Sequence, residues 1–218
     1  MLDKTFFETL LYIENPWEVS DVSMLPDESE IVISIEYTGT AAPCKECNRQ
    51  LSIYDRRGGR KWRHLDMCQM RTMLCCSVPR VNCPDHGVKT ISVPWADSSS
   101  RFTSHFESFA IELLSATKNQ TKTSKLLRIS FDSINTIMHK AVQRGLQRRD
   151  SDALIRTLGI DEKSFQRGHK YVTVVSDIDN RRVIDVCLNR TQNATKAILK
   201  SSLSTKQRDS VEAVCIDM

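Results

Sequence analysis

The chain has 218 residues, of which 40% are hydrophobic and 27% are charged, as in ordinary soluble proteins. The longest apolar run near the N-terminus, residues 10–13, is too short for a signal-peptide core or a membrane span. These features argue against a secreted protein and a membrane protein. They predict a cytoplasmic protein of one large domain or two to three small ones, with no membrane partner.

The net charge of +4 is unevenly distributed along the chain. Residues 1–40 carry nine acidic residues and one basic residue, residues 41–150 carry nineteen basic and nine acidic residues, and residues 151–218 carry eleven basic and nine acidic residues. A polyanion would bind the middle segment, whose net charge is +10. A solvated basic surface is the simpler alternative, so the surplus supports nucleic-acid binding without establishing it.

The first predicted domain, residues 1–37, combines a helix with a pair of strands. Apolar residues recur at helical spacing in residues 1–14, and Pro16 ends this helix. Strand-like runs follow at residues 17–24 and 30–37. No residue type in this acidic segment indicates chemistry, so we expect it to pack against the next domain.

Two knuckles of metal-ligand type lie in the second predicted domain, residues 38–92. Cys44 and Cys47 form a C-x-x-C knuckle, and Cys83 and His86 form a C-x-x-H knuckle further along the chain. Four such ligands in two knuckles fit tetrahedral structural zinc. In an intracellular chain, disulfides explain this spacing less well. The spacing therefore predicts a zinc-binding module. The strand-like run at residues 71–81 indicates that this module is rich in β-strands.

Three further cysteines leave the fourth zinc ligand open. Cys68, Cys75 and Cys76 lie between the two knuckles. Each is typical of a small buried hydrophobic residue, but one of them could replace His86 in the ligand set.

A basic stretch between the knuckles surrounds the pair Gly58-Gly59. Its basic side chains next to a turn are placed to contact phosphate oxygens, and we predict DNA binding by Arg56, Arg57, Arg60 and Lys61. The alternative is an exposed basic hairpin without a ligand. Trp62 could touch a base beside these contacts, but we predict that it lies in the core.

The third predicted domain, residues 93–150, holds three amphipathic helices at residues 104–117, 121–127 and 132–146. A short helix, a turn of three to four residues and a second helix that opens with Ser or Asp are typical of a helix-turn-helix. Arg128 stands where such a turn favours glycine, so a plain three-helix core is the alternative.

The third helix would be the recognition helix, with its first residues facing base edges in the major groove. Candidates for base contact are Ser130, Ser133, Asn135 and Thr136. Phosphate contacts, which add salt-dependent affinity without sequence discrimination, are predicted for Lys122, Lys125 and Arg128. Phe131 is predicted to pack in the core.

The fourth predicted domain, residues 151–218, has the order strand, strand, strand, helix, strand, with the helix at residues 192–204. This order implies a mixed α/β sheet in which the first and last strands lie side by side. Asp161 and Asp217 follow short apolar runs on those two strands, so their carboxylates would meet at one edge. Two carboxylates at one edge suit Mg²⁺. The simpler alternative is that each aspartate is a turn or cap residue.

The run Gly159-Ile160-Asp161-Glu162-Lys163 and the later run Val214-Cys215-Ile216-Asp217-Met218 resemble the catalytic domain of bacterial insertion-sequence transposases of the L-three family. The resemblance extends over residues 38–218 with its motifs in order. It implies a zinc finger, a helix-turn-helix and a DDE active site on an RNase H-like fold that uses Mg²⁺. Asp161 matches the first catalytic aspartate and Asp217 the second. The third acidic residue, a glutamate, has no counterpart, so the resemblance implies truncation after Asp217.

The expected fold is therefore multidomain α+β: a β-rich zinc module, a three-helix helix-turn-helix domain and a partial RNase H-like α/β domain. The resemblance implies a transposase that binds the terminal inverted repeats of a mobile element in the bacterial cytoplasm, at the nucleoid. We expect this chain to be a DNA-binding fragment with an incomplete catalytic site, which leaves enzyme activity undecided. Its partners would be double-stranded DNA and a second copy or the missing C-terminal part. The alternative is a zinc-stabilised helix-turn-helix regulator with a vestigial α/β tail.

Overall fold

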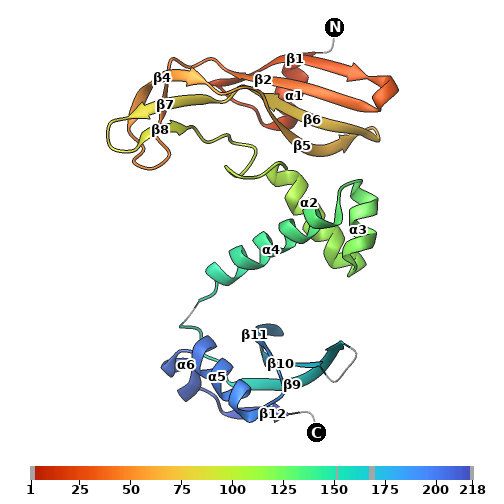
Figure 1. Ribbon diagram of the computed structural model, residues 1–218, viewed down its shortest axis with the longest axis vertical. Helices are drawn as coiled ribbons and strands as arrows, with labels where there is room; N and C mark the ends of the chain where they lie inside the picture. The colour runs from red at the N-terminus through yellow and green to blue at the C-terminus, as the bar shows by residue number, and fades with distance from the viewer. Residues whose placement is uncertain (1–2, 151, 167–169, 217–218) are drawn as a thin grey trace. The chain divides into compact units, whose positions relative to one another are not determined.

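The computed structural model describes residues 3–150, 152–166 and 170–216. The chain divides into two compact units, residues 1–142 and 143–218 (Figure 1). The first unit contains two of the predicted domains and most of the third. Each unit has its own buried apolar core, so each is described by itself.

The first sheet of the first unit joins the N-terminal segment to the middle of the predicted zinc module. Helix α1 (Lys4–Leu11) begins after Asp3, whose side chain accepts a hydrogen bond from the Thr5 N–H. Strand β1 (Trp17–Leu25), the 3-10 helix η1 (Pro26–Glu28) and strand β2 (Glu30–Tyr37) follow. The sheet has the order β1-β2-β6-β5, in which β5 spans Arg60–Met67 and β6 spans Met70–Cys76.

The predicted boundary between residues 37 and 38 falls inside this sheet. Strand β2 pairs in parallel with β6, and the register sets Ile33 opposite Leu74. Both side chains are fully buried, because alternate residues of each strand point to the same apolar side. The two segments consequently form one packed sheet, although about forty residues separate them in sequence.

The second sheet carries the two knuckles and has the order β3-β4-β7-β8 with antiparallel pairing throughout. Its strands are β3 (Ala41–Pro43), β4 (Gln50–Arg56), β7 (Pro79–Cys83) and β8 (Gly87–Thr90). The single strand expected at residues 71–81 is instead the end of β6 and the start of β7. Proline is tolerated as the first residue of a strand, and Pro79 opens β7 in the other sheet.

Three tryptophans lie in the core that the two sheets share. The rings of Trp17 and Trp62 both meet Trp95 edge to face, with centroid distances of 5.0 and 5.5 Å. Trp62 is fully buried, which confirms the prediction that it belongs to the core. Such contacts add to the apolar area that each ring buries.

The three predicted helices are present as α2 (Ser104–Thr117), α3 (Gln120–Leu127) and α4 (Phe131–Gln147). Thr103 and Asn119 cap the first two with their side chains. The helices share a buried cluster made of Phe106, Ala110, Leu127, Ile134 and Ile137.

Two residues around the start of α4 bear on the predictions for this segment. Arg128 ends α3 with a φ of 56°, a left-handed conformation that favours glycine, as the turn pattern led us to expect. Phe131, predicted to pack, is instead 49% exposed. It is the first residue of α4 and lies outside the buried stripe that Ile134 and Ile137 begin.

The second unit is a four-stranded sheet with two helices. Its strands are β9 (Thr157–Gln166), β10 (Lys170–Asp177), β11 (Arg182–Leu188) and β12 (Ala213–Ile216), in the order β11-β10-β9-β12. Strand β12 pairs in parallel with β9, which confirms that the first and last strands are neighbours. The helix expected at residues 192–204 is divided into α5 (Gln192–Ser202) and α6 (Thr205–Asp209), because Ser204 and Gln207 form a capping box that starts a new helix.

No helix in the described part of the chain has the length and apolar character that a membrane span requires.

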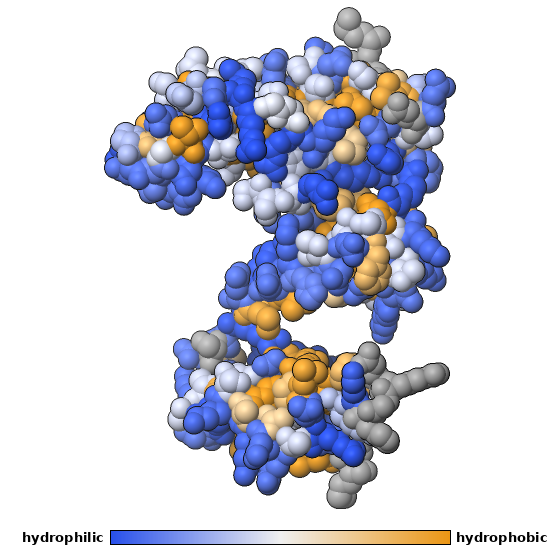
Figure 2. Space-filling model, viewed as in Figure 1, coloured by the Kyte–Doolittle hydropathy of each residue, from blue (hydrophilic) through white to orange (hydrophobic). Residues whose placement is uncertain are grey.

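Strand β12 is an apolar edge of the sheet in the second unit. Val214 is 52% exposed and Ile216 is 65% exposed, and Figure 2 shows apolar side chains on the surface of this unit. The unpaired backbone groups of an open apolar edge strand can hydrogen-bond with strands of other chains. We expect amide hydrogens of residues 213–216 to exchange much faster than those of β7, and residues 1–218 to associate as concentration rises. Hydrogen exchange read by mass spectrometry tests this, and equally slow exchange in β12 and β7 would contradict it.

Candidate metal centre and nucleic-acid interface

The four predicted zinc ligands lie together at one end of the second sheet. Cys44 follows β3, Cys47 lies in the turn before β4, Cys83 ends β7, and His86 precedes β8. One ligand atom from each lies within 4.8 Å of the others. The Sγ atoms of Cys47 and Cys83 are 3.7 Å apart, and the Cys83 Sγ lies 3.4 Å from the His86 Nδ1.

These spacings fit a tetrahedral zinc ion. With Zn–S bonds of about 2.3 Å and Zn–N bonds of about 2.0 Å, the edges of the tetrahedron are about 3.5–3.8 Å. The Cys44 Sγ and His86 Nδ1, at 4.0 Å, need to move by only a few tenths of an ångström. The side-chain set is therefore Cys₃His, the chemistry of a structural rather than an open catalytic zinc site.

A residue with a left-handed backbone conformation bends the chain in each knuckle. In the first, the Asn48 N–H donates to the Cys44 carbonyl at 2.8 Å, and Asn48 adopts a left-handed φ of 59°. In the second, Gly87 directly after His86 has a φ of 68°, where glycine is unstrained. These turns bring the two ligands of each knuckle within reach of each other, and Cys44 and Cys83 are also buried in the core of this unit.

The thiol pKa values differ within the cluster. The hydrogen bond with His86 lowers the pKa of Cys83 to about 6. At Cys47, the Arg49 backbone N–H lowers the pKa, but desolvation and the neighbouring sulfurs of Cys83 and Cys44 outweigh it, so the pKa is raised. Zinc binds the thiolate form, so binding would release the protons that remain.

The other cysteines between the knuckles do not belong to this cluster. Cys68 is exposed in the β5–β6 turn, and Cys75 and Cys76 lie in β6 of the other sheet. Burial raises the pKa of Cys76 to about 12, as expected for a thiol in the core. Among the described residues His86 is thus the fourth member of the group.

The basic stretch connects the two sheets. Strands β4 and β5 do not pair with each other, so these residues form a crossing connection and not the hairpin that was the alternative. Arg56 donates to the Tyr37 carbonyl at 3.1 Å. Arg60 donates to the Ser98 carbonyl at 3.1 Å, and its guanidinium lies 4.7 Å from the Trp62 ring centroid.

The remaining members of that stretch, Arg57 and Lys61, have exposed side chains. Lys122 and Lys125, the predicted phosphate contacts on α3, are exposed as well. The structure therefore leaves these four cations open to solvent, whereas Arg56 and Arg60 already contact the protein.

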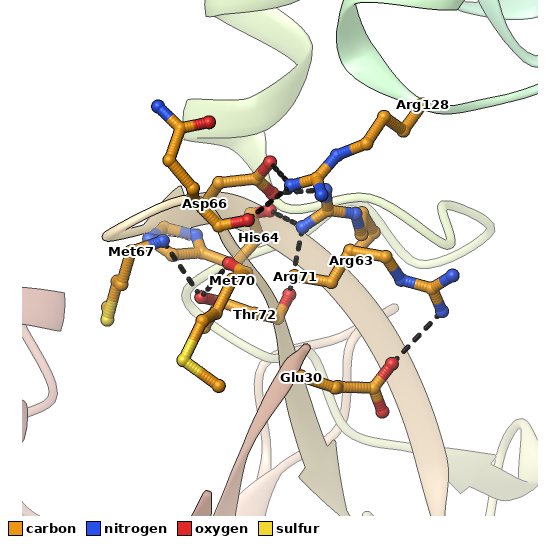
Figure 3. Close-up of polar contacts among 10 residues, drawn as sticks. Glu30, Arg63, His64, Asp66, Met67, Met70, Arg71, Thr72 and Arg128 are labelled. Carbon is orange, nitrogen blue, oxygen red and sulfur yellow. Dashed lines mark hydrogen bonds and ion pairs between the residues drawn. The ribbon is translucent and has the colours of Figure 1, made fainter. Parts of the chain in front are cut away.

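Arg128 takes part in a polar network with the β5–β6 hairpin (Figure 3). Its guanidinium binds the Asp66 carboxylate and donates to the Gln69 carbonyl at 2.8 Å. The same carboxylate binds Arg63, which also donates to the His64 carbonyl at 2.7 Å. Phosphate binding by Arg128 remains a prediction, but the structure assigns this side chain an additional partner that the sequence did not indicate.

The residues that α4 exposes to solvent are not the same as the residues predicted to contact bases. Ser130 and Ser133 hydrogen-bond to each other, with their Oγ atoms 2.8 Å apart, and Ser130 also accepts from the Ser133 N–H. Thr136 is exposed and Asn135 is half-buried. Both remain candidates, although the Thr136 hydroxyl donates to the Asp132 carbonyl at 2.8 Å. The two serines are engaged with each other at the start of the helix.

Two further polar residues share that side of α4. Asp132 and His139 are exposed, and with Asn135 and Thr136 they follow the spacing of one helical face. Sequence reasoning missed them because its candidates were confined to uncharged polar side chains near the start of the helix. Counting helical turns from the buried Ile134 and Ile137 would have identified this face.

Asp161 lies in the middle of β9, opposite Val174 of β10, and its side chain is exposed. The predicted strand ended near this residue, but β9 continues to Gln166 because its polar half pairs with the start of β10. The parallel register sets Ile216 of β12 opposite Ile160. Asp217 lies outside the described residues, so the meeting of the two carboxylates stays a prediction.

Comparison with protein families assigns three parts of the chain. Residues 40–86 match the zinc-finger of transposases IS204, IS1001, IS1096 and IS1165. Residues 91–142 match the helix-turn-helix domain of transposase family ISL3, and residues 158–218 match a transposase domain of the same family. The chain belongs to transposase family ISL3. Its matched parts are a zinc-finger module, a helix-turn-helix module and a transposase domain.

Curated ISL3-type relatives agree with this assignment. A transposase for insertion sequence element IS1557 from Mycobacterium tuberculosis is 30% identical over 190 residues, which cover 84% of this chain and 43% of that protein. A transposase for insertion sequence element IS1001 from Bordetella parapertussis is 24% identical over 223 residues, which cover 100% of this chain and 53% of that protein. The chain thus spans about half the length of these relatives. No solved structure matches it.

Proposed function

We propose that residues 1–142 bind double-stranded DNA at the terminal inverted repeats of a mobile element. The zinc-ribbon module holds structural zinc through Cys44, Cys47, Cys83 and His86, and α3 and α4 form the helix-turn-helix with α4 in the major groove. The observation that carries the proposal is the exposed polar face of α4. It lies within a helix-turn-helix family match, in the same compact unit as the Cys₃His cluster.

The charges around α4 support contact with phosphates. Lys122 and Lys125 on α3 are exposed, and α3 directly precedes the turn into α4. In a helix-turn-helix the first helix crosses the sugar–phosphate backbone while the second reads base edges. Arg57 and Lys61 supply two further exposed cations from the sheet connection.

Selection of bound duplexes from a random DNA pool by purified residues 1–218 tests the proposal. An enriched sequence motif is the expected result. Binding that is independent of sequence and disappears with salt would reflect only the phosphate contacts and would overturn recognition of specific repeats.

We infer that the second unit contributes to a DDE catalytic site with Asp161 and Asp217 as Mg²⁺ ligands. A polypeptide of residues 1–218 supplies these two aspartates, whereas the family resemblance implies a third acidic residue, a glutamate. Incomplete carboxylate sets position two metal ions poorly. We also propose self-association, or pairing with the remaining part of the transposase, through the β12 edge.

Residues 1–218 are therefore expected to bind a terminal-repeat duplex without cutting it. The measurement is nicking of an end-labelled duplex in Mg²⁺ or Mn²⁺, with Asp161→Asn as the matched control. Nicking by the wild-type sequence that Asp161→Asn abolishes would contradict the expectation.

A further inference from the structure

Asp132 combines three features within the exposed face of α4. It is the second residue of the helix, its side chain is exposed, and it lies one helical turn before Thr136 on the same face. Within the described ranges of the chain, no hydrogen bond or ion pair reaches its carboxylate. Asp132 therefore presents a free anion at the end of α4 that a recognition helix turns toward base edges.

A depression borders this residue. Its volume is about 360 Å³, and its walls come from the Ser99–Phe102 loop and from one face of α4 that includes Asp132, Thr136 and Lys140. Glu107 closes its floor with a buried carboxylate that accepts from the Ser100 hydroxyl at 2.7 Å. The surface around Asp132 is thus concave and polar, not a flat solvated helix face.

A carboxylate in a DNA interface is repelled by the phosphates, so it weakens binding to most sequences. The repulsion is offset where the carboxylate accepts a hydrogen bond from a base. In the major groove two bases offer such a donor, cytosine at N4 and adenine at N6. Adenine also sets its N7 acceptor beside that donor, and guanine O6 and thymine O4 are acceptors, so these three bases repel a carboxylate more than cytosine does. A free carboxylate on the helix face that contacts bases therefore favours sequences with a suitable base donor and disfavours sequences that place an acceptor opposite it.

We propose that Asp132 is a specificity-determining residue that requires cytosine at one position of the recognised DNA. The inference rests on the proposed function, in which α4 is the recognition helix. A purely structural role exists as the competing explanation, because an aspartate in the first turn of a helix stabilises it through the helix dipole. That role affects unfolding but not the choice of base.

The test repeats the duplex selection with Asp132→Ala, Asp132→Asn and the control Glu112→Ala. Glu112 is an exposed carboxylate on α2, so its replacement makes the same change in net charge away from α4. For Asp132→Ala we expect the cytosine preference at one position to fall roughly tenfold and binding to unrelated duplexes to increase. Asparagine pairs with adenine, so Asp132→Asn is expected to shift the preference toward adenine.

The outcomes separate this inference from the function on which it rests. If the wild type and Asp132→Ala enrich the same motif with equal preference, the assignment of Asp132 is overturned while DNA recognition stands. An equal change in Glu112→Ala would also overturn it, because net charge would then explain the effect. If the wild type enriches no motif, the proposed function fails and the inference fails with it.

Discussion

Replacing Cys83 by alanine is expected to abolish zinc binding and unfold the core of the first unit. Cys83 links two other members of the cluster, at 3.7 Å from the Cys47 Sγ and 3.4 Å from the His86 Nδ1. Structural zinc sites contribute about 10–16 kcal/mol of apparent binding free energy at neutral pH. This matches or exceeds the whole stability of a typical domain, about 5–15 kcal/mol, so the loss should not be tolerated.

Zinc content by atomic emission and thermal unfolding by circular dichroism measure the effect. Cys68→Ala is the matched control, because Cys68 is exposed and lies outside the Cys₃His group. The control should keep its zinc and unfold like the wild type. A Cys83→Ala chain that retains both zinc and the wild-type transition would show that the cluster does not hold the metal.

Replacing Asp66 by alanine is expected to destabilise the first unit by about 3 kcal/mol. Arg63 is only 6% exposed, and its guanidinium lies over the Phe106 ring at 5.4 Å from the centroid. Burial lowers the pKa of Arg63, and the Asp66 carboxylate opposes that shift. Without Asp66 the guanidinium remains charged and buried without an anion, which is the costly case for a buried ion pair.

Urea unfolding measures the change in free energy, and Arg71→Ala supplies the contrast. Arg71 pairs with Glu30 at 3.0 Å, but its side chain is about half exposed. Its replacement removes a solvated cation and leaves the Glu30 carboxylate, which is 13% exposed, so we expect a loss of about 1 kcal/mol, the upper end for surface pairs. Equal losses for Asp66→Ala and Arg71→Ala would contradict the view that the Arg63 network stabilises the junction between the sheet and the helices.

The local parts of the fold followed from the sequence. The bounds of α2 were predicted correctly, and those of α3 and α4 to within one residue, because caps and apolar spacing act over a few residues. For the same reason the knuckle spacing predicted the four residues that lie together in the Cys₃His cluster. His86 was preferred over Cys68, Cys75 and Cys76, and the cluster contains His86.

The pairings between distant segments did not follow from the sequence. Nothing in the run 30–37 indicates that β2 pairs in parallel with β6, because register depends on which apolar faces meet. The contact between Arg128 and Asp66 could not be predicted either, because the two residues lie sixty-two positions apart in the sequence. Asp161 was placed on the correct strand, but only the pairing with β10 extends that strand beyond it.

We propose that the zinc-ribbon module and the helix-turn-helix of the first unit together form a sequence-specific DNA reader. The most direct measurement is the affinity of residues 1–218 for the selected duplex and for a scrambled duplex of the same composition, before and after zinc removal. We predict discrimination between the duplexes in the zinc-loaded protein, its loss on chelation and its return when zinc is restored. Discrimination that is equal with and without zinc would contradict the claim.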